Sequence, residues 1–88
     1  NDDNALAKEE IFVRKKIDDI RKDILQLENN LQFFTNVDKK HPLMREALKS
    51  IHEQHEALAL WEDKLKELRL REKKEEEEVL APEAPKSV

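Results

Sequence analysis

The sequence contains no glycine and no cysteine among its 88 residues, and only 5% of the residues are aromatic. Glycine is the usual residue where a backbone must adopt positive φ, so a chain without it is expected to contain few tight turns. The absence of cysteine excludes disulfides and thiol chemistry. Because β-branched and aromatic residues are scarce and do not alternate along the chain, we do not expect a β-sheet.

The sequence also lacks any apolar run long enough to span a bilayer and any signal-peptide pattern. We therefore predict no membrane association and take the cytoplasm as the default location. The formal net charge is −4, with both signs interleaved, whereas a dedicated polyanion-binding protein normally has a basic excess. The chain begins at Asn1 rather than at Met, and we interpret it as a fragment or a processed product.

Charged residues, in contrast, are abundant at 43% of the chain, and together with leucine and alanine they give a composition typical of coiled coils. After a flexible N-terminus at 1–3, we predict a first helix at about 4–35. Its apolar residues recur at alternating intervals of four and three, which is a heptad seam with one polar interruption at Glu10. The seam consists of Leu6, Val13, Ile17, Ile20, Ile24, Leu27, Leu31 and Phe34.

The heptad pattern stops at residues 36–41, where we predict a loop, with Asn36 closing the first helix. Pro42 suits the first turn of a second helix, capped by His41 or Asp38. We predict this helix at 42–76, followed by a disordered tail at 79–88. Four glutamates at 75–78 lie at the negative end of its dipole and should promote fraying. Its seam consists of Met44, Ala47, Ile51, Gln54, Leu58, Trp61, Leu65 and Leu68.

The short connection requires the two helices to be antiparallel neighbours. A single register pairs the two seams in every layer, from Phe34 opposite Met44 to Val13 opposite Leu65. The predicted fold is therefore all-α, an antiparallel two-helix coiled-coil hairpin, with dimerisation into a helical bundle left open. Beyond Val13, the layers that pair Glu10 with Leu68 and Leu6 with Glu72 are expected to be loose.

Gln54 is the one polar residue of the second seam and is expected to face Ile24. Two interpretations remain open for it. It is either a solvated side chain at the edge of the seam or a polar residue that fixes the register.

Several apolar residues lie outside both seams. Isolated apolar residues are normal on protein surfaces, but these recur along the chain and include two phenylalanines. We interpret them as a second contact surface, used by a dimer partner or by upstream helices of a parent protein. The candidate partner face consists of Ile11, Phe12, Leu25, Phe33, Leu48 and Leu60, and Leu43 and Leu70 are similarly surplus.

Little in the sequence suggests catalysis or metal binding. His52 and His55 have the spacing of a metal-binding pair beside Glu56, but a zinc site needs three or four ligands and His41 is too distant to join them. Adjacent carboxylates such as Asp18 and Asp19 occur, but general acid–base catalysis needs a cleft, and we expect none in a helical hairpin. We predict no enzyme activity, no metal and no cofactor.

Basic clusters occur at 14–16, 21–22, 39–41 and 64–71, but acidic residues are interleaved with them. Mixed charge of this kind usually forms a solvated helix face with i,i+4 pairs. The alternative is a helical arm that contacts RNA or DNA, most readily through the loop cluster at 39–41. We regard nucleic acid as the less favoured partner.

The segment at 27–34, Leu-Glu-Asn-Asn-Leu-Gln-Phe-Phe, resembles the C-terminal helical hairpin of bacterial proteins in the domain-of-unknown-function 349 family. The resemblance extends from about Lys8 to Leu70 and includes Lys-Lys-Ile at 15–17 and Lys-Leu-Lys-Glu-Leu at 64–68. It implies the end of a longer helical-repeat protein of unknown role, with no catalytic residues. We therefore expect a non-catalytic interaction or scaffolding module.

Overall fold

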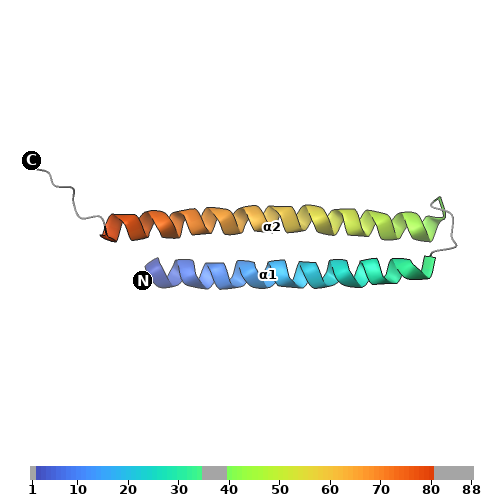
Figure 1. Ribbon diagram of the computed structural model, residues 1–88, viewed down its shortest axis with the longest axis horizontal. Helices are drawn as coiled ribbons and strands as arrows, with labels where there is room; N and C mark the ends of the chain where they lie inside the picture. The colour runs from blue at the N-terminus through green and yellow to red at the C-terminus, as the bar shows by residue number, and fades with distance from the viewer. Residues whose placement is uncertain (1, 35–39, 81–88) are drawn as a thin grey trace, which may run out of the picture.

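The computed structural model describes residues 2–34 and 40–80, and it confirms the prediction of an all-α helical hairpin (Figure 1). Helix α1 spans Asp2–Leu31, a short 3-10 helix η1 spans Gln32–Phe34, and helix α2 spans Pro42–Leu80. The two long helices lie side by side and antiparallel. At 1.5 Å per residue, α2 is roughly 58 Å long, and its last turns continue past the first residues of α1 (Figure 1).

The limits of α1 differ from those predicted. The helix begins at Asp2, two residues before the predicted start, and its α-helical part ends at Leu31 rather than near residue 35. The chain then tightens into η1, which is a common way for an α-helix to end. Asn36, the predicted end of the first helix, lies outside the described residues, as does most of the predicted loop.

His41 caps the start of α2. Its Nδ1 accepts a hydrogen bond of 3.1 Å from the backbone N–H of Leu43, and its carbonyl oxygen accepts one of 2.9 Å from the N–H of Arg45. A residue before proline is disfavoured in the helical region of φ/ψ space, so His41 is held in the non-helical conformation that a cap requires. Asp38, the other predicted cap, lies outside the described residues.

The C-terminal end of α2 reaches Leu80, four residues beyond the predicted limit. Val79 and Leu80, predicted to belong to the tail, are helical, whereas residues 81–88 lie outside the described part. Glutamate and lysine are strong helix formers. Their propensity outweighs the few tenths of a kcal/mol by which each exposed carboxylate disfavours a helix C-terminus.

The core is a single stripe between the helices. Its buried residues are Val13, Ile17, Ile20, Ile24 and Leu68, and among the described residues no polar side chain is buried. Leu6, Leu58, Trp61 and Leu65 pack against the cluster formed by Val13, Ile17 and Leu68. Seam residues nearer the loop are half-buried, namely Leu27, Leu31, Phe34, Met44, Ala47 and Ile51.

Two expectations about the seam can now be assessed. The expected loose packing near the open end is wrong, because Leu68 is only 1% exposed and Leu6 packs against the core. Trp61 supplies a large apolar side chain to this part of the core, and Glu10 and Glu72 join their polar ends rather than separating the helices. Gln54 is half-buried and forms no hydrogen bond with another described residue, which favours the solvated interpretation.

Candidate interaction surfaces

The contacts between α1 and α2 distinguish two sides of the hairpin. On one side, Arg21 forms an ion pair of 2.9 Å with Glu62, and Glu28 lies 3.9 Å from His55. On the other side, Glu9 lies 3.7 Å from Lys64 and Phe12 packs against Trp61. The heptad positions of these residues place the first group of contacts on one flank of the seam and the second group on the other flank. We call the first the groove side and the second the aromatic side.

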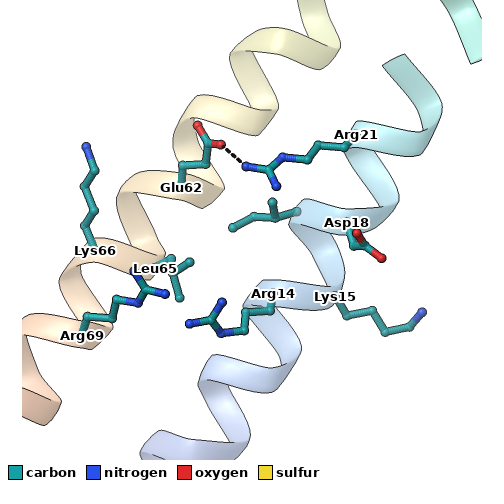
Figure 2. A pocket seen from close by; sticks show the side chains of 9 residues that line it. Arg14, Lys15, Asp18, Arg21, Glu62, Leu65, Lys66 and Arg69 are labelled. Carbon is teal, nitrogen blue, oxygen red and sulfur yellow. Dashed lines mark hydrogen bonds and ion pairs between the residues drawn. The ribbon is translucent and has the colours of Figure 1, made fainter. Parts of the chain in front are cut away.

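An open groove of about 900 Å³ occupies the groove side (Figure 2). Its walls carry five basic and two acidic side chains, an excess of three positive charges on a chain with a net charge of −4. The apolar residues of its lining are Ile17 and Leu65, which belong to the seam and form the floor of the groove. The complete lining is Arg14, Lys15, Ile17, Asp18, Arg21, Glu62, Leu65, Lys66 and Arg69.

The basic groups of this groove are unequally compensated. Arg21 is paired with Glu62 across the groove, and Arg14 forms a 2.6 Å ion pair with Glu10 one turn away on its own helix. Lys66 and Arg69 form no salt bridge with any other described residue. Figure 2 shows Arg14 and Arg69 extending toward each other from α1 and α2. The groove therefore has its uncompensated positive charge on the α2 side, at Lys66 and Arg69.

Glu10 and Glu72 meet where the groove ends, toward the open end of the hairpin. The hydrogen bond from Arg14, and then the hydrogen bond from Glu72, lower the pKa of Glu10. The same contact with Glu10 raises the pKa of Glu72, because a neighbouring carboxylate disfavours a second negative charge. Glu72 is therefore the carboxyl of the pair that protonates more readily. Arg14 and Arg69 favour the ionised form of both carboxyls.

The aromatic side is organised around Phe12. Its ring packs edge-on against Trp61, with the ring centroids 6.0 Å apart, and Lys16 Nζ lies 5.5 Å from the centroid of Phe12. Both contacts are of attractive kinds, between aromatic rings and between a cation and a ring face. Phe12 nevertheless remains 54% exposed, so these contacts leave much of its apolar surface uncovered.

The six residues of the candidate partner face are all exposed, between 43% for Leu48 and 81% for Phe33. Their heptad positions divide them between the two sides of the hairpin. Phe12, Phe33 and Leu60 fall on the aromatic side. The other three, Ile11, Leu25 and Leu48, fall on the groove side. The sequence alone had grouped them as one face, because it did not show which flank of each helix meets which.

The histidines proposed and rejected as a metal pair face different carboxylates. His52 lies 3.4 Å from Glu56 on α2, whereas His55 lies 3.9 Å from Glu28 on α1. Among the residues that the structure describes, no three histidine, aspartate or glutamate side chains are grouped as a metal ion would require. The same residues include no helix with the length and apolar character needed to cross a membrane.

The pocket found at the start of α2 is smaller, about 410 Å³, and is lined by Pro42, Arg45, Glu46 and Lys49. These four residues belong to the first two turns of one helix. The groove, by contrast, is built by both helices. It is the stronger candidate site of the two.

Comparison with known proteins assigns no relative to the hairpin: no protein-family model, no curated protein and no solved structure matches it.

Proposed function

We propose that this chain is a non-catalytic interaction module, a helical hairpin that binds another protein through the sides of its seam. The observation that carries the proposal is the exposure of Phe33, Leu60 and Phe12, at 81%, 71% and 54%, beside a seam that already occupies the facing stripes of both helices. Neither helix can cover these residues without opening the seam. A partner can.

The energetics support a partner. Full burial of one side chain of this size contributes about 1.5–3 kcal/mol, so covering several of them offsets a substantial part of the cost of association. The hairpin itself has a single-stripe core of five buried residues, and cores of this size are marginal. Binding would therefore also raise the stability of the fold.

The resemblance at 27–34 supports a parent protein of bacterial origin, in which upstream helices supply the partner. A second copy of the chain is the other partner of the same chemistry. Either partner would offer apolar side chains that can cover the exposed apolar residues of this hairpin.

A photo-cross-linking residue at Phe33, introduced in the cells that make the protein, tests the proposal. We expect it to capture protein, whereas the same residue at Lys8 should not, because Lys8 is exposed and lies opposite the seam. Capture at neither Phe33 nor Leu60 would contradict the proposal.

A nucleic-acid arm is the second candidate, favoured by the positive excess of the groove. Asp18 and Glu62 in its lining oppose it, because they repel a phosphodiester backbone. Binding to generic RNA measured over a salt series tests this candidate, since phosphate contacts give a steep salt dependence. The absence of binding at low salt would eliminate it.

A further inference from the structure

We infer that the groove binds the acidic end of α2, residues 75–78, from a second copy of this chain. Two hairpins would exchange these ends in a symmetric dimer. The inference rests on the proposed function, because it identifies a partner for one side of the same module.

The charges of the groove indicate an anionic occupant. Flanking positions of the seam pair Arg21 with Glu62 and Glu28 with His55. One heptad further toward the open end, the corresponding positions hold two arginines, Arg14 and Arg69 (Figure 2). Arg14 is paired with Glu10 on its own helix, so Lys66 and Arg69 are the basic groups of the groove that form no salt bridge with another described residue. A guanidinium matches a carboxylate in geometry as well as in charge.

The remaining lining favours a helical peptide over a nucleic acid. Ile17 and Leu65 form an apolar floor, and Ile11 and Leu25, 68% and 60% exposed, lie on the same side beyond the two ends of the groove. An amphipathic helix with acidic and aliphatic residues satisfies both features. A phosphodiester backbone would place charge against the floor, whereas a helix can place an aliphatic side chain there.

The chain carries acidic side chains next to an aliphatic one at the end of α2. Residues 75–78 are four consecutive glutamates, and the following residue, Val79, is 79% exposed. This part of α2 continues past the beginning of α1 (Figure 1), so α1 does not cover its last turns. The carboxylates of Glu76, Glu77 and Glu78 are exposed.

The same molecule cannot fill its own groove. α2 is one continuous helix from Pro42 to Leu80, so Lys66 and Glu76 are held roughly 15 Å apart along its axis. A second copy removes this constraint. Because each copy has one groove and one acidic end, a two-fold arrangement satisfies both grooves at once and closes at two subunits.

Sedimentation velocity of the full chain tests the inference, over a concentration series at low and high salt. We expect a monomer–dimer equilibrium with no larger species, and a dissociation constant that rises about tenfold or more at high salt, since the contacts are between exposed charges. A monomer at every concentration in low salt would overturn the inference. So would a dimer that salt does not weaken.

Charge reversal makes the test specific. The groove variant Lys66→Glu/Arg69→Glu and the end variant Glu76→Lys/Glu77→Lys should each lose at least tenfold in dimer affinity, because each brings like charges together. An equimolar mixture should recover a heterodimer, since both of its contacts are attractive again. The control Lys8→Glu/Lys49→Glu changes the net charge as the groove variant does, at exposed positions outside the groove, and should dimerise like the wild type. Circular dichroism establishes that each variant remains helical.

The outcomes separate this inference from the proposed function. A dimer that survives groove reversal but is lost in Phe33→Ser/Leu60→Ser overturns the inference and leaves the interaction module in place. Failure of the mixture to form a heterodimer likewise overturns the inference. If groove reversal abolishes binding to generic RNA while the wild type stays monomeric, the groove is a polyanion site and the inference is wrong. Failure of the proposed function is read from the photo-cross-linking experiment instead.

Discussion

Val13 and Leu68, toward the open end of the hairpin, are 0% and 1% exposed, whereas Leu31 and Met44, beside the loop, are only half-buried. The covalent connection would suggest the opposite, because it holds the helices together at the loop. The difference follows the side chains that α2 supplies to each half. Leu58, Trp61 and Leu65 pack against the tightly buried half.

At two of its four seam positions on α2, the half next to the loop receives a small or polar side chain, Ala47 and Gln54. Ala47 cannot fill the space between two helices, so Leu31 opposite it stays partly accessible, whereas Ile24, opposite Gln54 at the inner end of this half, is 6% exposed. The comparison shows that the volume of the side chains at the seam, rather than the distance from the turn, decides which part of a two-helix core excludes water.

The largest expected effect comes from placing a charge in the tightly packed half. Ile17→Asp should lower the free energy of unfolding by about 4 kcal/mol or more, because a carboxylate without a partner would be buried there. We expect the helical circular dichroism signal to be lost at ambient temperature. An unchanged thermal melt would show that Ile17, 5% exposed here, does not lie in the core.

Truncation of matched leucines measures the difference between the halves directly. Leu68→Ala should cost about 3 kcal/mol, within the range for buried leucines. Leu31→Ala should cost about 1 kcal/mol, because its side chain is already partly in water. Urea denaturation monitored by circular dichroism gives both values. Equal losses would contradict the contrast between the halves.

The cap on α2 concerns the loop half alone. His41→Ala should lower the free energy of unfolding by about 1 kcal/mol, since the N–H of Leu43 would lose its acceptor. His41→Asp, which supplies a better capping oxygen, should recover this loss. Thermal melts at neutral pH compare the three proteins, and a substitution to alanine without effect would show that the cap adds nothing to stability.

The smallest effect concerns the pH dependence of the open half. A raised pKa in Glu72 means that its contribution to stability is present below its ordinary pKa and is lost as pH rises through the raised value. Glu10, with a lowered pKa, contributes in the opposite sense, and its contribution is lost as pH falls. Glutamine at position 72 donates a hydrogen bond to Glu10 at any pH. Glu72→Gln should therefore raise Tm over the wild type more at neutral than at acidic pH.

Glu53→Gln is the control for this substitution, because it removes the same charge at an exposed position of α2 outside the groove and the acidic end. Thermal melts of the three proteins over a pH series make the comparison. If both variants change Tm equally at every pH, the contact between Glu10 and Glu72 has no part in stability.

Much of the fold was predictable because the heptad pattern is local and repetitive. The spacing of Ile17, Ile20 and Ile24 indicates a helix with one apolar stripe, and a second such stripe after a short break requires an antiparallel pair. The ends of the helices were less predictable. Small, opposing contributions to the free energy decide where each helix ends. At Gln32–Phe34 the α-helix changes into the 3-10 helix η1, and at Leu80 helix propensity outweighs the unfavourable interaction of the glutamates with the helix dipole.

The candidate site was only partly predictable. The basic clusters of both helices are visible in the sequence, but local pairing with acidic neighbours suggested a solvated face throughout. Most of the chain fits that description, as in the i,i+4 pairs of Lys22 with Asp18 and Arg71 with Glu67. Arg69 is an exception, because it forms no salt bridge with another described residue, and Figure 2 shows it extending toward Arg14 on the other helix.

The sequence by itself determined that this chain forms two long amphipathic helices that fold back on each other, because hydrophobic periodicity acts along each helix and needs no knowledge of the partner. Only the tertiary structure decided which layers are tightly packed, which exposed apolar residues share a side, and where two guanidinium groups and two carboxyls converge. These properties depend on the register and on the volumes of side chains far apart in sequence, and such pairs exist only once the helices are in contact.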